Sequence, residues 1–323
     1  MQVFAGADVN RAGKYGVYLF FVLSAFLLTS QFAAWQPADF TQPRRWLTYA
    51  FRRFIRIFPV YTSVLIAYVL MRKLDLRDLA PHLLLREGVH QFWTIPVECK
   101  YYLLLPFIAC ALFWAGRKGW KLGLASLLGV CALAAGLDAL DALWSVRDEV
   151  RLFRNLPPFL FGSALAIGCT ELQRRPHLQQ RWAPRLKFAS VVAALAILLR
   201  LPLVNETLFA PAAIFSKDLD PTVCGLLWSI FLLGAIQPTG LLSICMQWPP
   251  LRYLGTISFS AYLWHRKFIN DIDDFPASSP VRLLVFLAVV IAVASVSYFI
   301  LERPLQKLRL RTAPPATSPK PVD

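Results

Sequence analysis

Long apolar segments recur along almost the whole chain and constrain its fold more than any other feature. A helix that spans a bilayer needs about 20 mostly apolar residues, with a range of about 17–25. Nine candidate segments lie at 16–35, 54–71, 92–115, 122–144, 155–168, 188–203, 221–238, 251–269 and 280–301. The fifth and sixth are short, and the eighth is rich in Ser and Tyr. The pattern predicts an all-α protein, a polytopic transmembrane helical bundle with about nine spans.

The composition agrees with a membrane protein and excludes several other classes. Of the 323 residues, 57% are hydrophobic and 16% are charged, whereas soluble domains have about 45–50% and about 25%. This apolar excess excludes a disordered or collagen-like chain. The six cysteines are scattered without a C-x-x-C pair, so we expect packing residues rather than a disulfide or metal framework. We expect one transmembrane domain over 1–302 and a basic, disordered cytoplasmic tail over 303–323.

The net charge of +15 is distributed unevenly between alternate connections. Lys and Arg are more numerous in 36–53, 116–121, 169–187, 239–252 and 303–323 than in 1–15, 72–91, 145–154, 204–220 and 265–280. Because short cytoplasmic loops carry the excess of basic residues, the first set is predicted to be cytoplasmic, together with the C-terminus. The charge is spread over loops without a nucleic-acid motif, so the expected partner is the lipid bilayer and not a nucleic acid.

Three arginines at the start of the segment 54–71 are candidates for anion binding. Arg52 and Arg56 are spaced i,i+4, and Arg53 and Arg56 are spaced i,i+3, which places all three on one helical face. Planar guanidinium groups suit bidentate binding of phosphates or carboxylates. The alternative is a flank of the span whose basic side chains snorkel toward the membrane surface.

Glu98 lies among apolar and aromatic residues at the start of the segment 92–115. An unpaired carboxylate would be costly there, so Glu98 is a candidate functional residue. It would orient a catalytic imidazole or share a proton with Tyr102, one helical turn later. The alternative is an ion pair with Lys100 or a distant arginine that only fixes helix packing.

His265 ends a polar stripe on the segment 251–269. Ser258, Tyr262 and His265 are spaced i, i+4 and i+7 and so share one helical face. An imidazole titrates near neutral pH and can transfer protons, although a histidine at a helix end is often structural. Asp138 and Asp141 resemble a carboxylate pair, but without a partner motif they indicate an interfacial helix end.

The two remaining candidate histidines suggest no site, and the absence of known motifs excludes further classes of enzyme. His82 and His177 are expected to lie in loops without a special role. The sequence holds no H-E-x-x-H, P-loop, G-x-S-x-G or G-x-G-x-x-G motif, so zinc hydrolase, nucleotidase, serine hydrolase and dinucleotide-binding functions have no support.

Five segments, taken in order, resemble the acyltransferase-3 family of integral membrane proteins, which includes bacterial O-antigen acetylases. The segments and the family patterns that they resemble are Gly16–Leu28 (G-V-x-L-F-F-V-L-S-G-F-L-L), Arg52–Pro59 (R-R-x-x-R-I-x-P), Trp93–Tyr102 (W-S-L-x-V-E-x-x-F-Y), Leu254–His265 (L-G-x-I-S-Y-S-L-Y-L-W-H) and Leu301–Pro304 (I-E-R-P). Each pattern alone is weak, but five in family order are specific.

This resemblance implies transfer of an acyl group, commonly acetyl, from acyl-CoA (acetyl-CoA) to a hydroxyl of a cell-envelope saccharide or lipid-linked acceptor. It places the chain in the bacterial inner membrane. The R-x-x-R pair matched by Arg53 and Arg56 is associated with acyl-CoA, and Glu98 and His265 are expected to support catalysis. The loop charges place the arginines at the cytoplasmic end of their span and Glu98 and His265 near the outer ends of theirs. Donor and acceptor would then approach from opposite faces.

The sequence also departs from the family pattern. The family's first helix carries a histidine that acts as general base just before the G-V-x-L-F-F span, whereas no histidine precedes His82 here. We therefore expect nine spans of a ten-helix bundle, without the His-bearing first helix, and an inactive chain unless that helix is supplied. The alternative is a non-catalytic polytopic membrane protein, either a saccharide or lipid permease or an accessory subunit.

Overall fold

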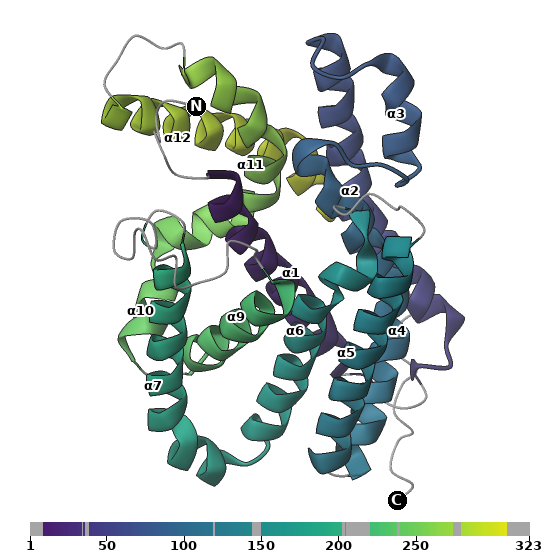
Figure 1. The fold of residues 1–323 in the computed structure, drawn as a ribbon, viewed down its shortest axis with the longest axis vertical. Helices are drawn as coiled ribbons and strands as arrows, with labels where there is room; N and C mark the ends of the chain where they lie inside the picture. Colours follow the sequence, from purple (N-terminus) through teal and green to yellow (C-terminus); the bar gives the residue numbers. More distant parts are fainter. Residues whose placement is uncertain are drawn as a thin grey trace, which may run out of the picture.

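The computed structural model describes residues 9–33, 35, 39–118, 120–143, 150–201, 204, 220–237, 240–273 and 279–308. Every regular element within these ranges is helical (Figure 1), which confirms the predicted all-α fold. The elements are α1 (Val9–Ala33), α2 (Pro43–Leu70), α3 (Leu76–Leu83), the 3₁₀ turn η2 (His90–Trp93), α4 (Thr94–Lys118), α5 (Trp120–Leu143), α6 (Leu152–Gln173), α7 (Pro176–Arg200), α9 (Pro221–Ala235), α10 (Leu241–Gln247), α11 (Pro249–Asp273), α12 (Ser279–Ser297), the π-helical turn η4 (Tyr298–Glu302) and α13 (Arg303–Gln306).

The described part of each of the nine apolar segments lies within a helix or within two residues of its end. Within the described residues, five helical stretches are long and apolar enough to cross a membrane: Gly13–Ala33, Pro43–Leu70, His90–Phe113, Pro176–Arg200 and Pro280–Gln306. Large apolar side chains such as Leu103 and Phe107 on α4 and Phe188 on α7 are exposed, as expected for helices that face lipid. The chain is therefore an integral membrane protein.

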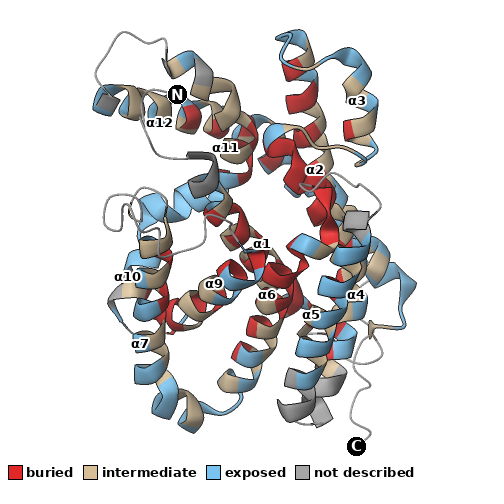
Figure 2. Cartoon of the chain, in the orientation of Figure 1, coloured by how far each residue is buried: buried red, intermediate tan, exposed pale blue. Residues whose placement is uncertain are grey.

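Helix α1 runs through the middle of the bundle and packs against α4, α6 and α9 (Figure 1). Buried residues gather along α1, α6 and the inner face of α2 (Figure 2). The approach of α1 and α6 is close, because a Cβ atom at Gly162 would lie only 2.3 Å from the carbonyl oxygen of Val22. Small residues permit such contacts between membrane helices. The Phe21 ring stacks on Phe159, with centroids 4.4 Å apart.

Helix α2 begins earlier than the sequence pattern predicts and runs antiparallel to α4. Pro43 occupies its first turn, where a missing N–H costs nothing, so the helix includes eleven residues before the predicted start at 54. The hydroxyl of Tyr49 donates to the carbonyl oxygen of Tyr102 at 3.0 Å, whereas the later residue Tyr61 packs against the earlier residue Phe92. The arginines of the 52–56 region therefore lie inside a long helix and not at its end.

Helices α11 and α12 pack against each other. Gln91 of η2 connects α11 to α2 through hydrogen bonds. The Gln91 amide donates to the hydroxyl of Tyr68 at 2.9 Å and to the carbonyl oxygen of Leu263 at 3.0 Å. Helix α12 ends in η4, a turn type that is rare and frequent at functional sites. The predicted tail begins with the short helix α13, and its residues 309–323 lie outside the described ranges.

Candidate functional site

The carboxylate of Glu98 is buried at the interface of α1 and α4, with 2% of the residue exposed. Its Oε1 atom accepts a hydrogen bond from Ser24 Oγ at 3.0 Å and another from the hydroxyl of Tyr102. The two hydroxyl oxygens are 2.9 Å apart, so the three groups form a closed cluster. The predicted partnership of Glu98 with Tyr102 is present.

Two features of this cluster leave room for chemistry. The second oxygen of Glu98, Oε2, is buried and has no hydrogen-bond partner among the described residues. A buried polar atom without a partner costs free energy, and at a functional site such an atom is available to a substrate. Ser24 is half-buried, whereas Glu98 and Tyr102 are buried, so the serine is the accessible member of the cluster.

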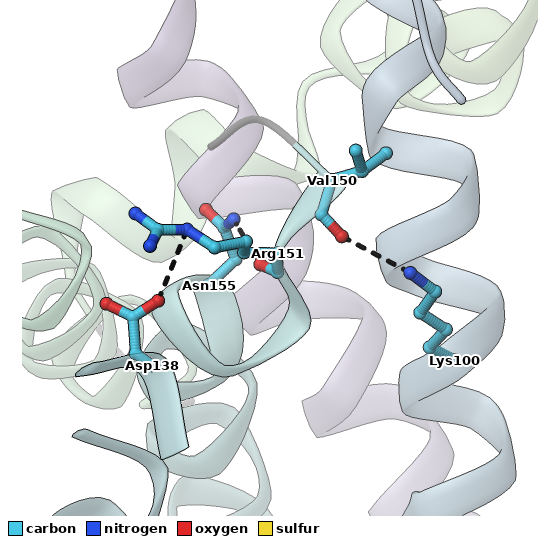
Figure 3. A network of polar contacts seen from close by, with 5 residues as sticks. All are labelled: Lys100, Asp138, Val150, Arg151 and Asn155. Carbon is cyan, nitrogen blue, oxygen red and sulfur yellow. Dashed lines mark hydrogen bonds and ion pairs between the residues drawn. The ribbon is translucent and has the colours of Figure 1, made fainter. Parts of the chain in front are cut away.

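Lys100 does not pair with Glu98. Its Nζ atom donates to the carbonyl oxygen of Val150, which lies just before the start of α6, at 3.4 Å (Figure 3). The hypothesis of a local Glu98–Lys100 ion pair is therefore wrong, because Lys100 bonds to Val150 and Glu98 to Ser24 and Tyr102.

The arginines of α2 supply the positive charge around Glu98. Arg53 lies over the ring of Tyr102, with its Cζ atom 5.9 Å from the centroid, and its Nε atom is buried without a partner. The charges of both Arg56 and Arg53 act on Glu98. Arg56 is exposed, and so is Arg52. A buried carboxylate therefore lies near the partly buried Arg53 and within electrostatic range of the exposed Arg56.

The arginines and Glu98 lie side by side, in contrast to the prediction that they occupy opposite ends of the membrane. The prediction assumed that the span of α2 starts at residue 54, which would put the arginines at its edge. Because α2 starts at Pro43 and is antiparallel to α4, Arg53 lies at the level of Tyr102. Arg53 and the Glu98 cluster therefore lie in one region of the bundle.

A second buried carboxylate, Glu302, lies at the end of η4, with 4% of the residue exposed. Ser260 Oγ of α11 donates to its Oε1 atom and lies 3.0 Å from Ser297 Oγ. The charge of Arg56 acts on Glu302 as it does on Glu98. Both carboxylates therefore lie within electrostatic range of Arg56.

Sequence reasoning assigned no role to Ser24, Ser260 or Glu302, although all three lie in the quoted family segments. A signal for Glu302 was available, because an acidic residue closes an apolar run of α12 and would be costly there without partners. Ser260 was not selected because the predicted polar face of this helix comprises Ser258, Tyr262 and His265.

The three residues of the predicted polar stripe of α11 make separate hydrogen bonds. Ser258 is exposed and donates to the carbonyl oxygen of Gly255 at 2.8 Å, and the hydroxyl of Tyr262 donates to the carbonyl oxygen of Gln91 at 2.7 Å. His265 Nδ1 lies 2.5 Å from the carbonyl oxygen of Tyr262. The structure therefore brings Glu98, Arg53 and Arg56 together, but its hydrogen bonds connect His265 to its own helix.

His82 and His177 lie on helices and not in loops. His82 of α3 is buried, with Nε2 accepting from the backbone N–H of Val89 at 3.2 Å and Nδ1 2.7 Å from the carbonyl oxygen of Asp78. The ring therefore donates from Nδ1 and closes the turn before η2. His177 is exposed in the first turn of α7.

The predicted aspartate pair is only partly described. Asp138 of α5 forms an ion pair with Arg151 at the start of α6, with Oδ1 and Nε 3.5 Å apart (Figure 3), whereas the side chain of Asp141 lies outside the described residues. Among the residues that the structure describes, no group of His, Cys, Asp and Glu side chains is arranged to hold a metal ion.

Comparison with known proteins identifies the family. Residues 2–302 match the acyltransferase-3 family, whose description is an acyltransferase domain. The chain is 24% identical to the peptidoglycan O-acetyltransferase OatA of Listeria monocytogenes, over 92% of this chain and 52% of OatA. It is 22% identical to a Staphylococcus aureus (strain COL) protein whose name provisionally assigns it as an O-acetyltransferase, over 67% of this chain and 36% of that protein.

The chain spans about half the length of OatA and less than half the length of the staphylococcal relative. No solved structure matches it. The family match covers nearly all of the chain, including every segment that contributes to the Glu98 and Glu302 clusters. The chain belongs to the acyltransferase-3 family of acyltransferase domains.

Proposed function

We propose that the protein transfers an acyl group, in the first instance acetyl, from acyl-CoA to a hydroxyl of a cell-envelope saccharide. One observation carries the proposal. Residues of separate family segments meet at one place: Ser24 of α1, Arg53 of α2 and Glu98 of α4, with Arg56 within electrostatic range of Glu98. A permease or accessory subunit would not need a reactive cluster of this composition.

Arg53 and Arg56 would bind the donor. Guanidinium groups bind phosphates with charge-assisted hydrogen bonds, and CoA carries several phosphates. Arg56 is exposed, and the buried Nε atom of Arg53 is a hydrogen-bond donor that has no partner among the described residues. Arg52 would add positive charge at the entrance, since it lies one residue earlier on an exposed face.

Glu98 would handle the proton that the acceptor hydroxyl loses. Its Oε2 atom is an acceptor without a partner in the described structure. A positioned acid or base typically contributes about 10²–10⁴-fold to the rate. The name of OatA states that it acetylates peptidoglycan, which supports an envelope glycan as the acceptor class.

The membrane placement completes the proposal. The protein would lie in a bacterial inner membrane with its C-terminus in the cytoplasm, where acyl-CoA is present. This orientation rests on the distribution of Lys and Arg between alternate connections, and a cysteine-labelling experiment at residues of 303–308 would test it.

The test is acetylation of envelope glycan in bacterial cells that express the chain, alone or with the His-bearing first helix of a family member. We expect base-labile acetate above the empty-vector level from the pair, and acetate from the chain alone would show that Glu98 suffices as the base for the acceptor hydroxyl. Arg53→Ala with Arg56→Ala should abolish it, whereas Arg86→Ala, which changes an arginine in the connection after α3, should not. No acetate from the chain or from the pair would contradict the proposed function.

A further inference from the structure

We propose that Ser24 is a nucleophile that carries the acyl group as a covalent ester between donor and acceptor. The inference rests on the proposed function and adds a catalytic residue and an intermediate to it. An activated serine requires a base within hydrogen-bond reach and a third group that orients the base. Ser24, Glu98 and Tyr102 meet this requirement.

The geometry of the cluster fits this assignment. Ser24 Oγ donates to Glu98 Oε1 at 3.0 Å, so the carboxylate is placed to take the serine proton. Tyr102 donates to the same oxygen and so holds the carboxylate in position. Ser24 is half-buried, whereas its base is 2% exposed. The proposed nucleophile is therefore more exposed than its base.

The first step consumes acyl-CoA and balances without another reactant. Ser24 Oγ attacks the thioester carbonyl carbon while its proton passes to Glu98. The carbon–sulfur bond then breaks, and the leaving CoA thiolate takes this proton from Glu98. The products are an acyl ester on Ser24 and free CoA thiol. The unpartnered Nε of Arg53 is a donor for the oxyanion that develops on the carbonyl oxygen.

The second step transfers the acyl group to the acceptor. An acceptor hydroxyl gives its proton to Glu98, for which the unpartnered Oε2 is available, and its oxygen attacks the ester carbonyl carbon. The bond between Ser24 Oγ and the acyl carbon breaks, and Oγ recovers a proton from Glu98. The acylated acceptor leaves and the serine is restored.

The other serines of α1 and α6 lack these features. Ser30 Oγ donates to the carbonyl oxygen of Phe26 in its own helix at 2.7 Å. Ser163 is fully buried and hydrogen-bonds only to neutral hydroxyls, those of Thr29 and Tyr101. Ser24 is thus the serine of this region that combines partial exposure with a carboxylate partner.

The experiment measures acyl-enzyme formation from donor alone. Purified protein in lipid nanodiscs is mixed with acetyl-CoA labelled in its acetyl group, quenched, and analysed by peptide mass spectrometry and by release of free thiol. We expect a burst of about one CoA per chain, as for covalent catalysis in general, and acetyl on the peptide that contains Ser24. Ser24→Ala should lose this label, and Ser30→Ala on the same helix should keep it.

Ser24→Cys separates a nucleophile from a structural serine. A cysteine nucleophile would form a thioester, which hydroxylamine removes at neutral pH, whereas the ester of the wild-type protein persists under that treatment. This variant decides the question even if Ser24→Ala fails to fold. A structural role alone predicts no hydroxylamine-sensitive label on Ser24→Cys.

Failure of this inference and failure of the proposed function give different results. If cells acetylate glycan and Ser24→Ala does so at the wild-type rate, or if the label is found on another residue, Ser24 is not the carrier but the function stands. If wild-type protein takes no label and cells contain no acetate with either the chain or the pair, both are overturned.

Discussion

Tyr101 and Tyr102 are neighbours on α4, both are buried, and each contacts a serine on another helix, yet their surroundings differ. The hydroxyl of Tyr101 lies 2.8 Å from Ser163 Oγ, which in turn accepts from Thr29 at 2.9 Å. All three residues of that group are fully buried and neutral. Tyr102 instead shares Ser24 with a carboxylate that keeps one oxygen unpaired.

The difference shows what distinguishes a site from a packing contact inside a helical bundle. The Tyr101 group pairs its hydroxyls and so removes the cost of burying them. The Tyr102 group buries the carboxyl group of Glu98, leaves its Oε2 atom without a partner among the described residues, and includes the partly exposed Ser24. A buried polar network is therefore not evidence of function by itself, whereas an unpaired carboxylate oxygen beside an accessible hydroxyl is.

The largest effect is expected from Glu98→Gln. The amide keeps the shape of the side chain but is a poor base, so acyl transfer should fall by about 10²–10⁴-fold. The rate of CoA release from acetyl-CoA is the measurement, and Ser163→Ala in the Tyr101 group is the control. A fall of less than about threefold would show that the carboxylate is not a base.

Arg56→Ala should weaken donor binding. Hydrogen bonds to charged groups contribute about 1.5–3 kcal/mol, so the KM for acetyl-CoA should rise about 10- to 100-fold. Arg52→Ala is the matched control, because Arg52 is also exposed and lies one turn earlier, and its KM should rise less. Equal increases in KM for the two variants would mean that Arg52 and Arg56 act only through their summed charge.

Tyr102→Phe and Tyr101→Phe test the comparison directly. Loss of the Tyr102 hydroxyl removes one donor to Glu98, and acyl-enzyme formation should slow about tenfold, equivalent to about 1.4 kcal/mol. Tyr101→Phe should leave that rate unchanged and lower the free energy of unfolding by about 1–2 kcal/mol. Thermal unfolding of both variants provides the second readout, and a reversed pattern would contradict our distinction between the two groups.

The smallest effect is expected from His265→Gln. The imidazole bonds to the carbonyl oxygen of Tyr262 and has no hydrogen bond to Glu98 or Glu302, so transfer should change by less than about twofold, as for most substitutions away from a reactive group. The interpretation of His265 as a catalytic support predicts a loss comparable to that of Glu98→Gln. The same CoA-release assay separates these two outcomes.

Some of the site could be predicted from residue types alone. Arg53, Arg56 and Glu98 stand out because ionisable groups are expensive within apolar segments, and Tyr102 follows from its position one turn after Glu98. Ser24 and Ser260 could not be selected in this way, since serine is common in membrane helices. Their importance depends on the carboxylate that each one meets on another helix.

The positions of helices were predictable, but their starts and relative levels were not. The described parts of the nine apolar segments lie within helices or within two residues of a helix end, because a membrane requires backbone hydrogen bonds to be satisfied within each span. The apolar pattern does not predict the start of α2 at Pro43, because the first turns of this helix are basic and polar. A span that starts at residue 54 places the arginines at the edge of the membrane, away from Glu98.

The amino-acid sequence by itself determined that the chain is an all-α membrane protein of the acyltransferase-3 family, because apolar length and ordered motifs are properties of the chain. Only the tertiary structure decided that Arg53 of α2, Glu98 of α4 and Ser24 of α1 lie together and that His265 hydrogen-bonds within its own helix. The physical reason is that the antiparallel packing of α2 on α4, and of α1 beside them, sets the relative depth of side chains. No pattern within one helix specifies that depth.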